Sequence, residues 1–115
     1  MKSPITTHVL DVGRGRPAAG VPVKLERLLP HGGWEPLGQG ETDQDGRASR
    51  LLPAGYPLEK GSYRLLFDTA AYWSALKSRG FYPSVAVVFL VESESEHYHV
   101  PLLLSPFGYS TYRGS

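Results

Sequence analysis

The chain has 115 residues and a mass of 12.6 kDa, which is enough for one compact domain and too short for two separate hydrophobic cores. Its formal net charge is +1, and Lys and Arg are scattered along the chain, so we expect no nucleic-acid partner. The absence of cysteine excludes disulfides, thiolate metal sites and thiol nucleophiles, and leaves His, Ser, carboxylates or Arg for any chemistry.

Hydrophobic runs in the chain are short. The longest, residues 85–91, is far below the roughly 20 residues needed to cross a bilayer, and no signal-peptide core follows the first residues. The sequence therefore predicts a soluble, cytoplasmic protein without a membrane partner. The 13 glycines and 10 prolines exceed ordinary usage while 41% of the residues are hydrophobic, which indicates many turns rather than disorder.

Apolar and β-branched runs alternate with Gly and Pro, which predicts about eight short strands and an all-β, two-sheet β-sandwich. In chain order the expected strands cover residues 5–12, 21–29, 34–37, 47–52, 63–67, 85–92, 97–104 and 109–112. Asp45-Gly46 and His31-Gly32-Gly33 are typical turn sequences between such strands. Residues 92–96 are polar and predict a hairpin turn.

One segment breaks the strand pattern. Asp68-Thr69 can cap a helix, Tyr72, Trp73 and Leu76 follow at helical spacing, and Gly80 with Phe81-Tyr82-Pro83 ends the segment. We therefore expect a single short helix on an otherwise all-β domain.

Two predicted strands each place histidine side chains on a face that mixes polar and apolar residues, because successive side chains of a strand point to opposite sides. In the strand that begins at residue 97, His97 and His99 lie on the face opposite the residues expected in the core. In the first strand, His8 shares a face with Thr6 and Leu10. The expected core set of the later strand is Tyr98, Val100, Leu102 and Leu104.

These histidines allow several interpretations. With an ordinary pKa of about 6.5, His8 or His99 can act as a general acid or base, but either can equally be a half-exposed strand residue. His8, His97 and His99 could also form a three-histidine zinc site, because residues i and i+2 of a strand share a face. We expect His97, which is nearer the polar turn, to be solvated, and we assign His31 no role.

Arg47 and the tail are the remaining candidates. Arg47 directly follows the Asp45-Gly46 turn, where its guanidinium could bind a carbonyl, a carboxylate or a developing oxyanion, or could simply be solvated. The tail over residues 109–115 is aromatic and compact, which predicts a docked strand that holds Tyr112, Arg113 and Ser115 in place.

Five segments together carry a resemblance to a known family. They are TTHVLD at residues 6–11, GRPA at 15–18, TDQDGR at 42–47, HYHVPLLLSP at 97–106 and YRGS at 112–115. The chain resembles the 5-hydroxyisourate hydrolases, enzymes of purine breakdown within the transthyretin-like family. The resemblance covers essentially the whole chain, and the terminal YRGS is its most specific element.

The resemblance implies one domain over residues 1–115, a sandwich with one short helix, and a homotetramer, built as a dimer of dimers, whose central channel holds the active sites. It implies hydrolysis of 5-hydroxyisourate to 2-oxo-4-hydroxy-4-carboxy-5-ureidoimidazoline, with no cofactor and no metal. The implied catalytic residues are His8, Arg47, His99 and Ser115, and the implied substrate-binding residues are His8, Arg47, Tyr112 and Arg113.

Roles within that site are hypotheses. We assign Arg47 to the oxyanion and the substrate oxygens, and His99, with His8 as its rival, to activation of water. The other histidine, or the hydroxyls of Tyr112 and Ser115, would orient the substrate or relay a proton. Two other functions stay open: a small-molecule carrier of the thyroid-hormone type, and a His-based zinc hydrolase.

Overall fold

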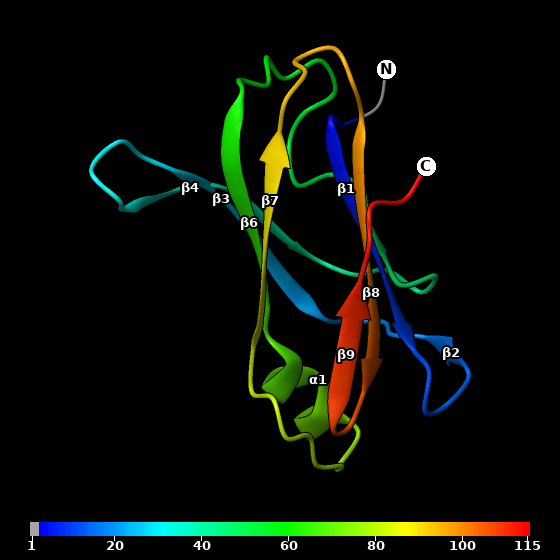
Figure 1. Ribbon diagram of the computed structural model, residues 1–115. Coiled ribbons are helices and arrows are strands. Elements are labelled where there is room, and N and C mark those ends of the chain that lie inside the picture. Colours follow the sequence, from blue (N-terminus) through cyan, green and yellow to red (C-terminus); the bar gives the residue numbers. More distant parts are fainter. Residues whose placement is uncertain (1–2) are drawn as a thin grey trace.

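A computed structural model describes residues 3–115 as two sheets packed face to face, with one helix at one end (Figure 1). One sheet has the strand order β2-β1-β8-β9, with β5 also paired to β1, and the other has the order β4-β3-β6-β7. The elements are β1 (Ile5–Asp11), β2 (Arg16–Pro17), β3 (Pro22–Leu28), β4 (Trp34–Glu41), β5 (Arg47–Ala48), β6 (Gly61–Phe67), α1 (Thr69–Ala75), β7 (Val85–Val91), β8 (Tyr98–Ser105) and β9 (Gly108–Thr111). The predicted two-sheet sandwich with one short helix is confirmed.

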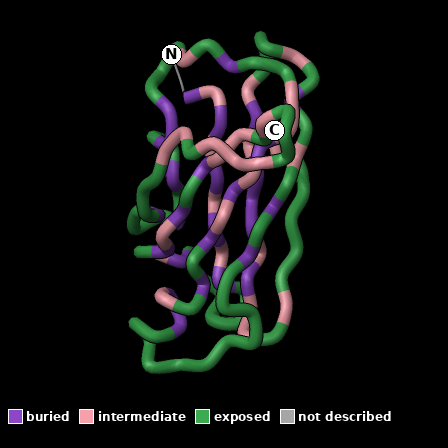
Figure 2. Tube along the Cα trace, turned by 90° about the vertical axis from the view of Figure 1, so that its left-hand side faces the viewer, coloured by how far each residue is buried: buried purple, intermediate pink, exposed green. Residues whose placement is uncertain are grey.

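The core lies between the two sheets, and buried residues alternate with more exposed ones along the strands (Figure 2). In β1, every second residue from Ile5 is buried, so Thr6 and His8 lie on the outer face as predicted. In β8, Tyr98 and the expected apolar set are buried, whereas His99 is only half-buried. Strand alternation therefore places the imidazoles outside the core, on the β1–β8 sheet.

Helix α1 begins where the sequence indicates. The Asp68 carboxylate accepts a hydrogen bond from the backbone N–H of Ala71 at 3.0 Å, which caps the first turn. Tyr72 and Trp73 are buried, and the Tyr72 hydroxyl donates to Oδ2 of Asp11 in β1 at 2.7 Å. Burial and then this hydrogen bond raise the pKa of Tyr72 to about 12, so its proton stays in place and ties the helix to the sheet. Within residues 3–115, no helix is both long and apolar enough to cross a membrane.

Several boundaries differ from the prediction for physical reasons. Strand β2 was not predicted, because Gly15 and Pro17 read as turn residues, but an edge strand needs no hydrogen bond from Pro17. Strand β4 extends four residues past the predicted end at Leu37, since its Pro and Gly residues lie at a sheet edge, where the register with β3 shifts and leaves Leu37 unpaired. The expected strand over 47–52 ends at Ala48, and the chain beyond it turns so that Leu51 and Leu52 enter the core.

Candidate active site

The site is assembled around β1, which has β8 on one side and β5 on the other. Strand β1 runs parallel to β8, and this pairing sets Thr6 opposite His99. On its other side β1 pairs with β5, which sets His8 opposite Arg47. Three segments that are far apart in the sequence thus bring their polar side chains to one face of one sheet.

The turn before β5 fixes the backbone of Arg47. The Asp43 carboxylate accepts hydrogen bonds from the backbone N–H groups of Asp45 at 2.9 Å and Arg47 at 3.0 Å. The bond from Arg47 is the largest contribution that lowers the pKa of Asp43, so this carboxylate stays charged. Gly46 adopts a φ of +78°, and a Cβ there would lie 2.3 Å from the Val9 carbonyl, so the turn packs tightly on β1 only with glycine.

His8 is held against the same turn. Its Nε2 lies 2.8 Å from the backbone carbonyl of Asp45. A carbonyl can only accept, so Nε2 carries the proton, and in the neutral ring Nδ1 is the acceptor. His8 is therefore oriented by the turn that also positions Arg47.

His97 and His99 share one hydroxyl group. The Thr6 Oγ1 lies 3.0 Å from Nε2 of His97 and 2.8 Å from Nδ1 of His99. The two rings are nearly parallel, with centroids 6.4 Å apart and an angle of 17° between their planes. The hydroxyl therefore bridges two imidazoles from the same strand.

The environment of His99 favours its neutral form. Burial lowers the pKa of His99 first, and the positive charge of Arg47 and the rings of His97 and His8 lower it further. A hydrogen bond between the His99 ring and the backbone of Thr6 opposes these effects in part. His99 is thus an uncharged imidazole near neutral pH, the form that can accept a proton.

The tail docks on β8, as the sequence predicts. The backbone N–H of Gly114 donates to the carbonyl of His99 at 2.8 Å, and the two residues form an antiparallel bridge. A Cβ at position 114 would lie only 2.6 Å from Cδ2 of His99. Only glycine lets the tail approach the imidazole this closely.

An open cleft of about 710 Å³ lies over this face. Arg47, His99 and Ser115 border it together. Within residues 3–115, Arg47 takes part in no ion pair, so its charge is available to a ligand. The complete lining is Ser3, Thr6, Thr7, Arg47, Ser49, Arg50, Leu52, Pro53, Ala54, His97, His99 and Ser115.

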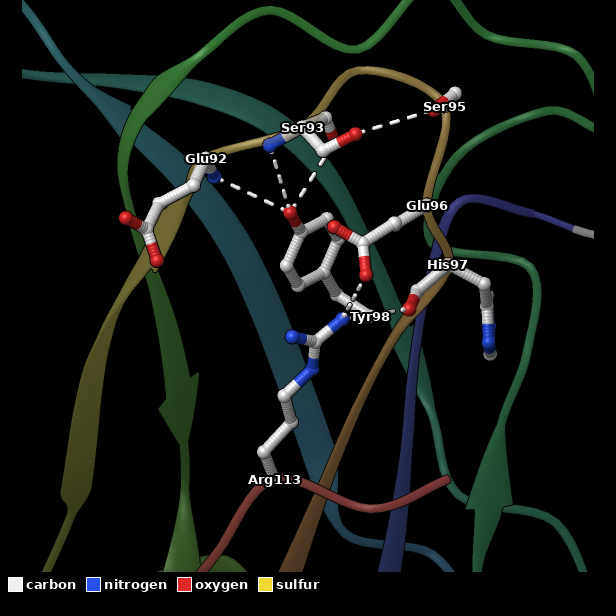
Figure 3. A network of polar contacts seen from close by, with 7 residues as sticks. All are labelled: Glu92, Ser93, Ser95, Glu96, His97, Tyr98 and Arg113. Atoms are coloured by element: carbon white, nitrogen blue, oxygen red, sulfur yellow. Dashed lines mark hydrogen bonds and ion pairs between the residues drawn. The ribbon is translucent and has the colours of Figure 1, made fainter.

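Three of the predicted site residues lie outside this lining. His8 is next to Arg47 in the sheet but does not border the cleft, and the Tyr112 side chain is exposed. Arg113 turns toward residues 92–96, where its guanidinium lies 3.3 Å from the Glu96 carboxylate and 4.5 Å from the centre of the Tyr98 ring (Figure 3). The hairpin turn predicted at 92–96 is wrong, because these residues connect β7 of one sheet to β8 of the other. The structure of the single chain therefore gathers Arg47, His99 and Ser115 at the cleft and leaves His8, Tyr112 and Arg113 at its margin or beyond.

Sequence reasoning missed Thr6 and Arg50 as cleft residues and expected His97 to be solvated. His97 is instead half-buried and bonded to Thr6. The face shared by Thr6 and His8 was visible in the alternation, but the parallel register that sets Thr6 beside the two imidazoles was not. In residues 3–115, no group of three or more His, Cys, Asp or Glu side chains is placed to hold a metal ion.

Comparison with known proteins identifies the family of the chain. The family model described as "HIUase/Transthyretin family" matches residues 5–114. A 5-hydroxyisourate hydrolase from Mus musculus is 47% identical over 98% of this chain and 96% of its own length. The uric acid degradation bifunctional protein TTL from Arabidopsis thaliana is 50% identical over 99% of this chain, which spans 38% of that protein's length.

Solved structures give the same result for the fold. Sea bream transthyretin in complex with thyroxine superposes with a TM-score of 0.90 at 36% identity, covering 97% of this chain and 95% of that one. The 5-hydroxyisourate hydrolase of Klebsiella pneumoniae gives a TM-score of 0.84 at 34% identity, covering 98% and 99%. With its sandwich fold and a family match over residues 5–114, the chain belongs to the HIUase/Transthyretin family.

Proposed function

We propose that this protein is a 5-hydroxyisourate hydrolase, which opens a ring amide of 5-hydroxyisourate to give 2-oxo-4-hydroxy-4-carboxy-5-ureidoimidazoline during urate breakdown. One observation carries the proposal: a neutral imidazole, His99, and a guanidinium that forms no ion pair within residues 3–115, Arg47, border the same cleft. Amide hydrolysis needs a base for water and a cation for the oxyanion, and this pair supplies both. The relatives named as 5-hydroxyisourate hydrolases support the substrate.

In this mechanism His99 removes a proton from the attacking water, and Arg47 stabilises the negative charge that develops on the carbonyl oxygen. The ring nitrogen that leaves takes up the same proton when the amide bond breaks. His99 acts as the base rather than His8, because His99 borders the cleft while Nε2 of His8 is engaged by the Asp45 carbonyl.

The other predicted residues have supporting roles in the proposal. Ser115 borders the cleft and orients the substrate through its hydroxyl. His8 supports Arg47 through the shared turn. Tyr112 and Arg113 contact substrate only in an assembly that brings them to a neighbouring cleft, since within one subunit Arg113 faces Glu96.

The test of the activity is to supply freshly generated 5-hydroxyisourate and follow its ultraviolet decay. We expect the protein to accelerate the decay, and we expect Arg47→Ala, His99→Ala, His8→Ala and deletion of Ser115 to slow it. His31→Ala is the matched control, because His31 lies in the exposed turn between β3 and β4. Absence of acceleration by the unaltered protein contradicts the proposal, and unchanged rates in folded variants contradict the assigned site.

A carrier of a thyroid-hormone type ligand is the second candidate, favoured by the similarity to sea bream transthyretin. It predicts saturable binding of thyroxine and no effect on hydroxyisourate decay. Titration calorimetry with thyroxine, beside the decay assay, separates the two functions. A His-based zinc hydrolase predicts stoichiometric zinc and loss of activity with a chelator, whereas the proposed mechanism requires no metal or cofactor.

The proposal includes a single domain, assembled as a cytoplasmic homotetramer, a dimer of dimers. Apolar side chains stand exposed on one edge strand of each sheet, with Val88 and Leu90 of β7 58% and 56% exposed and Tyr109 of β9 also exposed. Edge strands of this kind favour pairing with another copy of the chain. Light scattering behind size exclusion tests it, with a monomeric mass as the contradicting result, and cell fractionation tests the location.

A further inference from the structure

The hydroxyl between His97 and His99 is a feature that the hydrolysis mechanism above does not use. Thr6 Oγ1 lies within hydrogen-bond distance of Nε2 of His97 and Nδ1 of His99, at 3.0 and 2.8 Å. A threonine hydroxyl has one proton to donate and two lone pairs to accept with. It can therefore donate to one imidazole and accept from the other, and it cannot donate to both.

This proton count ties together the tautomers of the two rings. If Nδ1 of His99 donates to Thr6, the hydroxyl donates to His97, whose own proton is then on Nδ1. If Nε2 of His97 donates to Thr6, the hydroxyl donates to His99, whose own proton is then on Nε2. The favoured neutral states thus have both rings as Nδ1–H or both as Nε2–H.

We propose that Thr6 and His97 form a proton relay behind His99, which switches Nε2 of His99 from base to acid within one turnover. This inference rests on the proposed hydrolase function. Nδ1 of His99 is bonded to Thr6, so Nε2 is the ring nitrogen that meets the water and the leaving group. Thr6 is a positioning residue in this scheme, since it acts on the substrate only through His99.

The number of protons on Thr6, His97 and His99 is restored at the end of each catalytic cycle. As water attacks the carbonyl carbon, its proton passes to Nε2 of His99, the Nδ1 proton passes to Thr6, and the Thr6 proton passes to Nε2 of His97. His99 is then neutral with a proton on Nε2, and His97 is an imidazolium. When the carbon–nitrogen bond breaks, the leaving nitrogen takes the Nε2 proton, and the proton on His97 returns through Thr6 to Nδ1 of His99.

The position of His97 suits it to hold the transient charge. It borders the catalytic cleft and also a second cleft of about 630 Å³, which is lined by Glu94 and Glu96 among others. Carboxylates near an imidazole favour its charged form. In the cleft itself Arg47 disfavours a charge on His99. The charge of Arg47 therefore disfavours a second proton on His99 and favours passing a proton on through Thr6 to His97.

The kinetic test compares Thr6→Val, which keeps the shape of the side chain and removes the hydroxyl, with Thr6→Ser, which keeps the hydroxyl. We expect Thr6→Val to lower kcat about tenfold to a hundredfold with little change in KM, and Thr6→Ser to restore most of it. Equal losses in both variants would mean that the methyl group matters rather than the proton path, and would overturn the relay.

Non-additivity provides a second kinetic criterion. His97→Asn should lower kcat about as much as Thr6→Val, and the double variant should be no slower than either, because a relay fails as a unit. His31→Asn is the matched control for a histidine lost from an exposed turn. Multiplying losses in the double variant would contradict the relay.

A measurement without substrate separates the relay from the hydrolase function. Side-chain ¹⁵N chemical shifts of the neutral protein report the tautomer of each histidine, and we expect His97 and His99 to share one tautomer and to lose this coupling in Thr6→Val. Opposite tautomers in the unaltered protein would overturn the relay even if the enzyme is active. Absence of hydroxyisourate hydrolysis with coupled tautomers would instead contradict the function alone.

Discussion

Arginine side chains on the two sheets have opposite surroundings. In the β4-β3-β6-β7 sheet, Arg64 lies 2.6 Å from the Glu26 carboxylate and under the Trp34 ring, and Arg27 contacts Glu35 at 2.8 Å. In the other sheet, Arg47 has no ion pair with any residue between 3 and 115, although it begins β5 opposite His8 and borders the same cleft as His97 and His99. The first arrangement uses charge for packing, and the second keeps charge for a ligand.

The difference shows where the molecule keeps a charge for function. Beside His99, the guanidinium of Arg47 opposes protonation of the imidazole, whose pKa is lowered first by burial and then by this charge. An ion pair between Arg47 and a carboxylate would weaken that effect and would also neutralise the cation that the oxyanion needs. We expect variants on the two sheets to affect different measurements.

The largest expected effect comes from matched variants of the two arginines. Arg47→Met should lower kcat/KM about a hundredfold to a thousandfold, because it removes a charged donor for the oxyanion, with little change in Tm. Arg64→Met should leave kcat/KM unchanged and lower stability by about 1–3 kcal/mol, because it strands the half-buried Glu26 carboxylate. The measurements are hydroxyisourate decay and thermal unfolding of the same preparations. If both variants lowered both quantities equally, the contrast between the sheets would be wrong.

Substitution of two glycines tests the same contrast between a sheet that affects activity and a sheet that affects stability, with a smaller expected change. Gly114→Ala should lower kcat about tenfold to a hundredfold, because its Cβ would displace the His99 ring, while thermal unfolding changes little. Gly38→Ala in β4 should lower Tm and spare kcat, since its Cβ would lie 1.8 Å from the Leu51 carbonyl. Gly40→Ala is the control, because only Leu51 Cδ2, at 3.8 Å, lies near its Cβ. Normal kcat in Gly114→Ala would show that the tail does not set the position of His99.

Much of the fold could be predicted from local patterns. Alternation gave the outer face of β1 and β8, and Asp68 with Tyr72 and Trp73 gave the helix, because these depend on neighbours in sequence. The short strands β2 and β5 could not be delimited, since two-residue pairings are decided by which strand lies alongside.

The candidate site was predicted only in part, for the same reason. His8, Arg47 and His99 could be predicted because their side chains can act as bases or as a cation and because they lie in motifs that resemble those of a known family. The partnership of Thr6 with His97 and His99 depends on the parallel register of β1 and β8, which no local pattern specifies. The direction of Arg113 depends likewise on where the connection between the two sheets at residues 92–96 places Glu96.

The smallest expected effect is on the pH dependence of turnover. His99 must be neutral to accept a proton from water, so kcat/KM falls as pH drops through its pKa. Burial and Arg47 hold that pKa below the usual 6.5, so we expect the acid limb of the profile to lie below pH 6.5. In Arg47→Met the residual activity should show this limb at higher pH, because a repelling charge is gone, and in Arg64→Met the limb should not move.

Stability should change with pH in the same direction. Because the folded-state pKa of His99 is depressed, the unfolded chain binds its proton first as pH falls below about 6.5, and protonation favours unfolding. The contribution of His99 to the free energy of unfolding is therefore intact above the unfolded-state pKa and is lost as pH falls through the folded-state value. Denaturant unfolding of His99→Gln should show a weaker decline over this range than the unaltered protein. An equal decline in both would show that the loss of stability comes from another group and that the folded-state pKa of His99 is not depressed.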